Sequence, residues 1–293
     1  MTGTQQWGVT SMAGQLETVA MRRPGAILGA DHQRWHYTKP LNPDRLVAQY
    51  ESFVEAVASS GAEIHWLPDS SDDDLADSVF VYDPSFMVDG GAIILRPGKP
   101  LRLAEAELHA TFYKQLDVPI LGTIEAPGII EGGDCFWLDH STLAVGKGFR
   151  TNAAGIDQLT DILAPLGVEV AAFDMPYHLG PEVCLHLMSV VSPLDKDLAL
   201  VHPPLMPTAL YQRMVDMGYR LLAAPPDEFE ASLGLNLNVL ATGPRQVIAI
   251  AGFDGTLEEM RNAGCTVTTF AADELCIPCE GGPTCLTRPL RRT

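Results

Sequence analysis

The chain has 293 residues and a formal net charge of −18, with 46% hydrophobic and 19% charged residues. Such a composition is typical of a folded globular protein and excludes a disordered chain. The negative charge disfavours nucleic acid and anionic membrane surfaces as partners and is compatible with a small cationic ligand. No run approaches the ~20 apolar residues of a membrane-spanning helix.

Short apolar runs alternate with longer amphipathic segments along the chain. The amphipathic segments mostly end in Gly or run into Pro, which terminates helices. The expected strands lie at 16–21, 62–67, 78–83, 91–97, 142–146, 168–173, 198–202, 219–225, 237–241, 246–251 and 265–270. The expected helices lie at 44–61, 102–116, 152–167, 206–219 and 255–264.

A coarse repeat of helix, Gly turn and strand recurs at intervals of roughly 40–60 residues. It is visible in IDQLTDILAPLGVEVAAFD (156–174) and ALYQRMVDMGYRLLAAP (209–225), with strand pairs between the helices. Repeats of this kind predict a pseudo-symmetric α/β array in which each unit buries its apolar face against its neighbours. Because no long linker interrupts the pattern, we expect residues 1–293 to form a single domain.

Six cysteines are few for this length, and several stand in apolar runs. Together with a polar N-terminal stretch that lacks a secretory pattern, they predict reduced thiols in a cytoplasmic protein. Three of them crowd into CIPCEGGPTC (276–285). A zinc site would require a second ligand pair, and a redox pair would stand after a strand at the start of a helix. We therefore interpret Cys276 and Cys279 as small apolar residues, whereas Cys285 follows a Gly-Gly-Pro turn and is a candidate nucleophile.

Potential partners for Cys285 are spread along the chain. Glu131 and Asp134 flank the Gly-Gly turn of IIEGGDCFW, and His186 stands in the apolar segment CLHLMS, where we expect a strand. Each has a simple structural explanation, as an acidic turn or as a hydrogen-bonded core histidine.

Further polar residues border apolar runs. Asp77 and Asp83 bracket the expected strand 78–83, and Asp83 precedes a proline, a common way to begin a turn. Arg102 and Arg150 are equally compatible with an exposed surface. Taken singly, none of these residues indicates a function.

Taken together and in this order, the motifs resemble the guanidine-modifying superfamily of arginine deiminases, dimethylarginine dimethylaminohydrolases and amidinotransferases. The resemblance rests on EGGD, GKGFRTN about sixteen residues later, the HL pair at CLHLMS and the near-terminal GG-x-x-C, and it runs from LETVAMRRPG to CLTRPL. It implies a five-bladed α/β propeller of ββαβ units with the active site in the central channel.

The resemblance also implies roles for particular residues. Cys285 would be the nucleophile, His186 the general acid and base, and Glu131 a carboxylate that orients the site. Asp83 would hold the guanidinium of a small cationic substrate. The remaining substrate-binding residues that it implies are Asp77, Phe80 of the F-x-x-D stretch, Arg102, Arg150 and Asp134, the two arginines facing a substrate carboxylate. No metal or organic cofactor is implied, and a homodimer is the default expectation for an oligomer.

Two positions bear on the choice within the superfamily. Where deiminases and amidinotransferases carry an aspartate two residues after the histidine, this chain has Met188, which favours an alkylated guanidinium. The dimethylarginine type commonly carries an acidic residue before Asp83, where this chain has Tyr82. The dihydrolase type carries Asn at the position of Asp83, which disfavours that type. Hydrolysis of an Nω-substituted arginine is our first prediction, arginine deimination or dihydrolysis the second and amidinotransfer the third. A silent propeller that binds a cationic amino acid is the non-enzymatic alternative.

Overall fold

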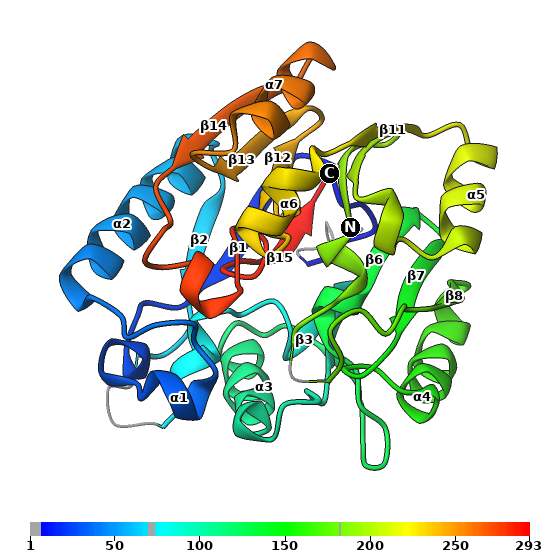
Figure 1. The fold of residues 1–293 in the computed structure, drawn as a ribbon. Helices are drawn as coiled ribbons and strands as arrows, with labels where there is room; N and C mark the ends of the chain where they lie inside the picture. Colours follow the sequence, from blue (N-terminus) through cyan, green and yellow to red (C-terminus); the bar gives the residue numbers. More distant parts are fainter. Residues whose placement is uncertain (1–6, 70–73, 182) are drawn as a thin grey trace.

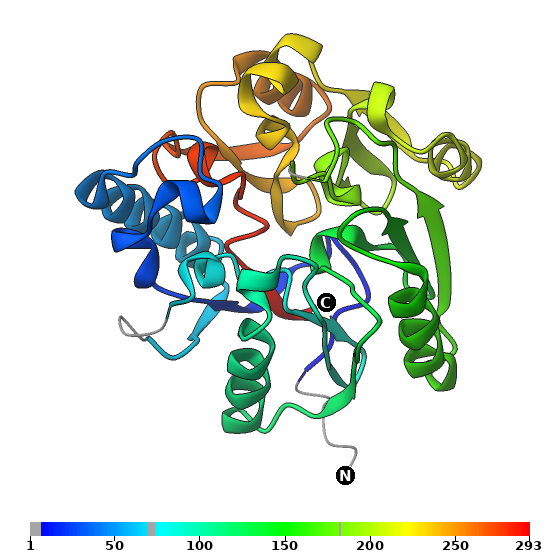
Figure 2. The same cartoon turned by 60° about the horizontal axis from the view of Figure 1, so that its bottom comes forward.

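The computed structural model describes residues 7–69, 74–181 and 183–293, and it contains five three-stranded sheets arranged as a ring (Figures 1 and 2). The strands are β1 (Leu16–Met21), β2 (Glu63–Trp66), β3 (Ser85–Val88), β4 (Gly91–Ile94), β5 (Ile120–Thr123), β6 (Cys135–Asp139), β7 (Thr142–Lys147), β8 (Glu169–Asp174), β9 (Val191–Asp195), β10 (Leu198–Val201), β11 (Arg220–Ala223), β12 (Leu240–Gly243), β13 (Gln246–Ile250), β14 (Thr266–Phe270) and β15 (Arg288–Arg292). The helices are α1 (His32–Trp35), α2 (Pro43–Ser59), α3 (Glu105–Gln115), α4 (Ala153–Leu163), α5 (Thr208–Asp216), α6 (Pro226–Ser232) and α7 (Asp254–Asn262).

Every sheet has the same internal order. The middle strand pairs antiparallel with one neighbour and parallel with the other, as in β3-β4-β5 and β6-β7-β8. The parallel strand follows a helix, because a parallel connection needs a crossover whereas the antiparallel pair needs only a turn. Each unit is therefore ββαβ, and the predicted five-bladed propeller is confirmed.

The ring is closed by the two ends of the chain. The sheet β15-β1-β2 joins the last strand to the first, with Ala20 opposite Arg288 and Leu16 opposite Arg292. Figure 1 shows the red β15 beside the blue β1. The residues that follow Cys285 are thereby fixed within the first blade, close to the axis of the ring.

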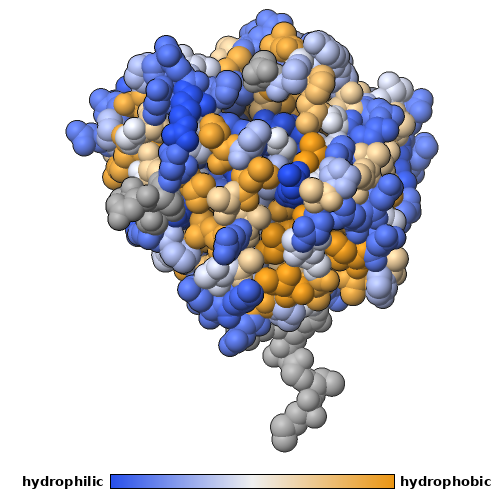
Figure 3. Space-filling view, turned by 90° about the horizontal axis from the view of Figure 1, so that it is seen from below, coloured by the Kyte–Doolittle hydropathy of each residue, from blue (hydrophilic) through white to orange (hydrophobic). Residues whose placement is uncertain are grey.

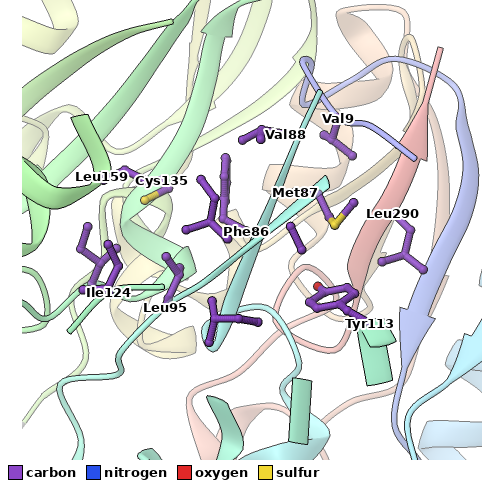
Figure 4. Close-up of a cluster of buried hydrophobic side chains, with 14 of the residues drawn as sticks. Val9, Phe86, Met87, Val88, Leu95, Tyr113, Ile124, Cys135, Leu159 and Leu290 are labelled. Atoms are coloured by element: carbon purple, nitrogen blue, oxygen red, sulfur yellow. The ribbon is translucent and has the colours of Figure 1, made fainter. Parts of the chain in front are cut away.

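The helices lie on the outside of the ring (Figure 2) and bury one face against the strands. In α2, the Asn42 side chain accepts from the Arg45 amide and Pro43 occupies the first turn, which favours helix initiation. Phe53 of this helix packs on Phe270 of β14, with ring centroids 4.8 Å apart. A second group of apolar side chains fills the space around β3, including Phe86, Met87 and Leu290 (Figure 4).

Two sequence-based assignments are wrong. Residues 78–83 form no strand, because Ala76–Val79 is a 3-10 helix followed by a turn into β3. His186 is likewise outside any strand and stands at the N-terminus of the 3-10 helix Leu187–Ser189, before β9. Residues 76–83 are all buried, and those around His186 are buried or half-buried, so neither segment shows the alternation of exposed and buried positions that is specific for a strand. The short helices α1 and α6 were not predicted.

The surface of the molecule is mixed in hydropathy. On the face shown in Figure 3, hydrophobic side chains gather toward the middle and lower part, and hydrophilic ones toward the rim. Among the described residues, no helix is long and apolar enough to cross a membrane.

Candidate active site

A cavity of about 350 Å³ gathers most of the predicted site residues. This volume is typical of a small-molecule site. The predicted residues that line it are Asp77, Phe80, Asp83, Arg102, Arg150, His186 and Cys285. The two others, Glu131 and Asp134, lie directly behind this wall and are buried. The fold thus brings together residues from four separate regions of the sequence.

The Gly-Gly turn allows His186 to approach closely. Gly132–Asp134 forms a 3-10 turn at the start of β6, and a Cβ atom at Gly133 would stand 2.3 Å from Nδ1 of His186. Any larger residue would therefore displace the imidazole. The Gly133 amide also donates to Oδ1 of Asp83 at 2.9 Å, so one backbone turn fixes both side chains.

Glu131 connects His186 to Arg150. Its Oε2 lies 2.7 Å from Nε2 of His186, and its Oε1 accepts from Nε of Arg150 at 2.9 Å and from the Gly98 amide at 2.8 Å. Burial alone would raise the pKa of Glu131, but the Arg150 charge and the His186 hydrogen bond lower it. Burial would lower the pKa of His186, yet nearby Cys184, Asp83 and Glu131 raise it well above its ordinary value. The pair therefore rests as carboxylate and imidazolium.

Cys285 lines the cavity next to Asn238. The Asn238 Nδ2 donates to the Cys285 sulfur at 3.1 Å. Burial and then the Asp83 charge raise the pKa of Cys285 to about 11, against the opposing effects of the Gly282 amide, Asn238 and His186. Without a ligand the thiol is therefore protonated at neutral pH. A cation bound beside it would favour the thiolate.

Asp83 and Arg102 form a buried ion pair. Nη1 of Arg102 donates to Asp83 at 2.6 Å, its Nε and Nη2 donate to Glu105, and Nη2 also reaches the Phe80 carbonyl. Each nitrogen of Arg102 therefore already has a protein acceptor, which places this side chain as a support for Asp83. Arg150 differs from Arg102 because it contacts Glu131 through Nε, and this ion pair does not occupy its two terminal nitrogens.

Asp77 and Asp134 also have internal partners. Asp77 accepts from the Tyr37 hydroxyl at 2.8 Å and from Nζ of Lys99 at 2.6 Å. Oδ1 of Asp134 accepts from the Leu187 amide at 2.9 Å and so joins the Gly-Gly turn to the 3-10 helix after His186. Burial raises the pKa of Asp134 to about 6.

The six cysteines are free thiols that occupy different environments. Cys276 is fully buried in an apolar cluster, as its apolar interpretation predicted. Cys279 is half-buried against the same cluster and also lines the cavity of about 350 Å³. Sequence reasoning missed Cys184, whose sulfur lies 3.4 Å from Nδ1 of His186, and Asn238. Cys184 stands in the CLHLMS segment, two residues before His186, where its local contact was the available signal. Asn238 has no motif around it, and only the tertiary contact with Cys285 identifies it.

A metal site was also considered. In the described part of the chain, the group able to place three ligand atoms within 4.8 Å of one another is Asp83, Glu131 and His186. Arg102 and Arg150 already pair with its two carboxylates. The negative charges of the two carboxylates are therefore already balanced by arginines. A divalent metal would need these carboxylates unpaired, so the group is better suited to a monovalent organic cation.

Comparison with known proteins agrees with this geometry. A family model described as arginine deiminase matches residues 69–224, more than half of the 293 residues. The chain belongs to the arginine deiminase family. The superfamily resemblance drawn from the sequence motifs is thereby confirmed.

Two sequence relatives and one further solved structure show what this chain is similar to. The N(G),N(G)-dimethylarginine dimethylaminohydrolase of Streptomyces coelicolor is 36% identical over 157 residues, 54% of this chain and 57% of that protein, so the match spans little more than half of its length. The enzyme of the same name from Pseudomonas aeruginosa is 27% identical over 252 residues, 86% of this chain and 90% of that protein. Its structure with citrulline superimposes with a TM-score of 0.74 over 94% of this chain and 99% of that one, at 22% identity.

The third is the N-terminal domain of ArgZ, a cyanobacterial arginine dihydrolase. It superimposes with a TM-score of 0.77 over 94% of this chain and 97% of that domain, at 18% identity. Because proteins with two different activities superimpose about equally well, the fold alone does not distinguish between these reactions.

Proposed function

We propose that this protein hydrolyses an Nω-substituted arginine, such as a methylated arginine, at the guanidinium carbon to give citrulline and an amine. The observation that carries the proposal is the cavity into which Cys285, His186 and Asp83 all face, with His186 held by Glu131 at 2.7 Å. The names of the Streptomyces and Pseudomonas relatives, and the citrulline bound to the latter, support the same substrate class.

Binding of the substrate prepares the nucleophile in this proposal. The guanidinium would lie against Asp83, which faces the cavity beside Cys285. Its positive charge would lower the raised pKa of the thiol, so that the thiolate forms only when substrate is present. Arg150 is the candidate for the substrate carboxylate, because its terminal nitrogens are not used for Glu131.

The proposed reaction consists of two successive displacement steps at the guanidinium carbon. The Cys285 thiolate attacks the carbon and forms a C–S bond, after which the imidazolium of His186 gives its proton to the substituted nitrogen and the C–N bond breaks. The neutral His186 then takes a proton from water, which attacks the same carbon and breaks the C–S bond. The second water proton leaves the adduct hydroxyl as the C–S bond breaks, and the departing amine takes it up. The products are the ureido group of citrulline, the protonated amine and the regenerated thiolate.

The surroundings of Cys285 favour a substituted nitrogen. Met188 is buried in an apolar cluster and lines a small cavity of about 30 Å³ that also borders Cys285 and His186. Leu235 contributes to the same wall. Met188 offers an alkyl group an apolar contact and provides no carboxylate that would accept from an unsubstituted NH₂ on that side, while the polar residues Ser189, Asn238 and Glu280 lie elsewhere in the same lining.

A parallel substrate assay tests the choice of substrate. The purified protein is incubated with arginine, monomethylarginine and dimethylarginine, and citrulline, ornithine, methylamines and ammonia are measured. We expect citrulline and a methylamine from the methylated substrates. Ornithine and ammonia from arginine, with dimethylarginine unchanged, would instead establish the dihydrolase activity of the second prediction.

Covalent labelling tests whether the protein is an enzyme of this kind at all. We expect a haloacetamidine to add covalently to Cys285. We also expect Cys285→Ser and His186→Ala to lower turnover at least ~10³-fold. Cys276→Ala and Cys279→Ala serve as matched controls that keep activity. A folded protein without an adduct at Cys285 would favour the silent cation-binding propeller.

A further inference from the structure

A second, smaller cavity lies behind the active site, between β15 and β12. Its volume is about 20 Å³. Three of its lining residues, Tyr82, Met188 and Thr284, also line the small cavity beside Cys285. In the sequence, Tyr82 directly precedes Asp83 and Thr284 directly precedes Cys285, while Met188 follows His186 by two positions. The second cavity is therefore enclosed by the far side of the segments that carry the site.

Two arginines of β15 place positive charge in this cavity. Arg288 is 2% exposed, donates from Nη2 to the Tyr82 carbonyl, and lies over the Tyr82 ring at 3.7 Å from its centroid. Arg292 donates to the carbonyls of Gly14 and Ala241, both at 2.7 Å. Within the described ranges neither arginine forms an ion pair, and no acidic residue lines the cavity.

Buried cations without a counter-charge are costly to a folded protein. Arg288 is buried and Arg292 is half-buried. Burial lowers the pKa of Arg292 to about 10, Tyr82 opposes this shift, and the Arg288 charge adds to it. The two arginine charges therefore repel each other, and a negative charge between them would relieve that repulsion.

Two residues of the cavity lining, Arg288 and Trp137, each carry a buried N–H group that lacks a protein acceptor. Nε of Arg288 and Nε1 of Trp137 are both buried and have no hydrogen-bond partner in the part of the chain that the structure describes. Both groups donate and neither accepts. Such a pair in one cavity calls for an acceptor, and two cations in the same lining call for one that carries negative charge.

We propose that this cavity binds a small monovalent anion of the halide class, with chloride as the ordinary occupant. Its volume suits a single ion of about the size of a water molecule and excludes phosphate or a carboxylate ligand. The anion accepts from Arg288 and Trp137, and its charge offsets those of Arg288 and Arg292. It stabilises the closed ring by joining β15 to β6.

Thermal unfolding of the full chain measures this binding. Sodium gluconate is replaced stepwise by sodium chloride at constant ionic strength and constant pH. Because a ligand that binds only the native state stabilises it by mass action, we expect the melting temperature to rise by about 2–6 °C and to saturate. A melting temperature independent of chloride in this titration overturns the proposal.

A matched pair of variants locates the effect. Trp137→Phe keeps an aromatic ring but removes the Nε1 donor, and we expect it to lose the chloride-dependent rise. Trp66→Phe makes the same change at a tryptophan that is 36% exposed on β2, and it should respond like the unaltered protein. An unchanged chloride response in Trp137→Phe contradicts the assignment.

Crystals grown with sodium bromide provide a test that needs no variant. We expect one anomalous peak within hydrogen-bond distance of Nε of Arg288 and Nε1 of Trp137. Density for water alone at that position, without an anomalous signal, shows that the cavity does not select an anion and overturns the proposal even if the variants fail to fold.

Discussion

At the scale of single residues, the proposed nucleophile Cys285 stays protonated in the absence of a bound cation. Burial raises the pKa of the Cys285 thiol, whereas His186 is held as an imidazolium beside Glu131. Asn238 is the neutral group that touches the sulfur directly. A hydrogen bond to sulfur stabilises the thiolate more than the thiol, so Asn238 limits how far burial raises the pKa.

Substitution of Asn238 tests this balance. Asn238→Ala removes the donor to Cys285, and we expect alkylation of Cys285 by iodoacetamide at pH 8 to slow about 3–10-fold. Asn238→Asp keeps the acceptor for the Thr284 amide but places an anion at the sulfur, so it should be slower still. Asn262→Ala, at an exposed position of α7, is the control. Equal rates in all variants, followed by mass spectrometry, would rule out this role.

Asp134 predicts a pH dependence of stability. Its pKa is raised to about 6 in the native state, above its value of ~3.9 in an unfolded chain. The native state therefore binds this proton more tightly, and its contribution to stability is present below pH ~4 and is lost as the pH rises through 6. The Asp134→Asn variant has no carboxyl to ionise here. We therefore expect its free energy of unfolding, relative to that of the unaltered protein, to increase as the pH rises from 4 to 8.

Urea unfolding at pH 4, 6 and 8 measures this difference. Asp134→Ala should be less stable than Asp134→Asn by about 1–3 kcal/mol at every pH, because both variants lack the titrating carboxyl and only in the alanine variant does the buried Leu187 amide lose its acceptor. Asp174→Asn, whose side chain is 80% exposed, is the control. A constant difference between Asp134→Asn and the unaltered protein would disprove the raised pKa.

At the scale of elements, short 3-10 turns rather than strands carry the site. Gly132–Asp134 and Leu187–Ser189 are joined by the hydrogen bond from Leu187 to Asp134, and each begins immediately after a site residue. A turn of this kind aims one side chain inward while its backbone amides bind another, as the Gly133 amide binds Asp83. The regular β-hairpins that follow, β6-β7 and β9-β10, anchor both turns.

Gly133 is the position where this arrangement is most sensitive. Gly133→Ala would place Cβ 2.3 Å from Nδ1 of His186, so the imidazole must move away from Glu131. We expect turnover of the methylated substrate to fall at least ~10²-fold, because a general acid works only in correct geometry. Gly29→Ala, whose Cβ would meet nothing within 4 Å, should keep full activity.

Thermal unfolding accompanies these activity measurements. A cooperative transition in Gly133→Ala would show that the loss of turnover comes from displacement of His186 and not from unfolding. Full activity in a folded Gly133→Ala would mean that His186 does not need its present position.

At the scale of the whole molecule, closure of the ring delivers Cys285 to the site. The nucleophile precedes β15, and β15 pairs with β1 at the other end of the chain. Leu290 of β15 is fully buried in the apolar cluster around β3 (Figure 4). The stability of the last strand and the position of the nucleophile are therefore linked.

Leu290→Ala tests this link. We expect a loss of about 2–5 kcal/mol in the free energy of unfolding, because a buried leucine is replaced by a cavity. Leu121→Ala, at a leucine of β5 that is 39% exposed, should change it by less than about 1 kcal/mol. Urea unfolding compares the two, and a loss in Leu290→Ala no greater than in Leu121→Ala would show that β15 does not hold the ring together.

Much of this architecture was predictable from local patterns. The helix α2 and the strands β7, β10 and β13 follow from amphipathic and apolar periods that the structure confirms. The segment 78–83 and the surroundings of His186 were mispredicted, because an apolar run buried on every side has no period that separates a strand from a buried turn. Asn238 carries no sequence signal, since its contact with Cys285 joins segments 47 residues apart. Cys184 stands two residues before His186 in CLHLMS, and the sequence does not show that its sulfur turns toward the imidazole.

By itself the sequence determined the class of fold, the repeated ββαβ unit and a set of candidate residues, because these depend on local hydrophobic periods, turn residues and ordered motifs. Only the tertiary structure decided which charges are already paired. Arg102 is engaged by Asp83 and Glu105, whereas Arg288 and Arg292 have no acid within the described residues. Such pairing depends on how the ring closes in space, and no spacing along the chain encodes it.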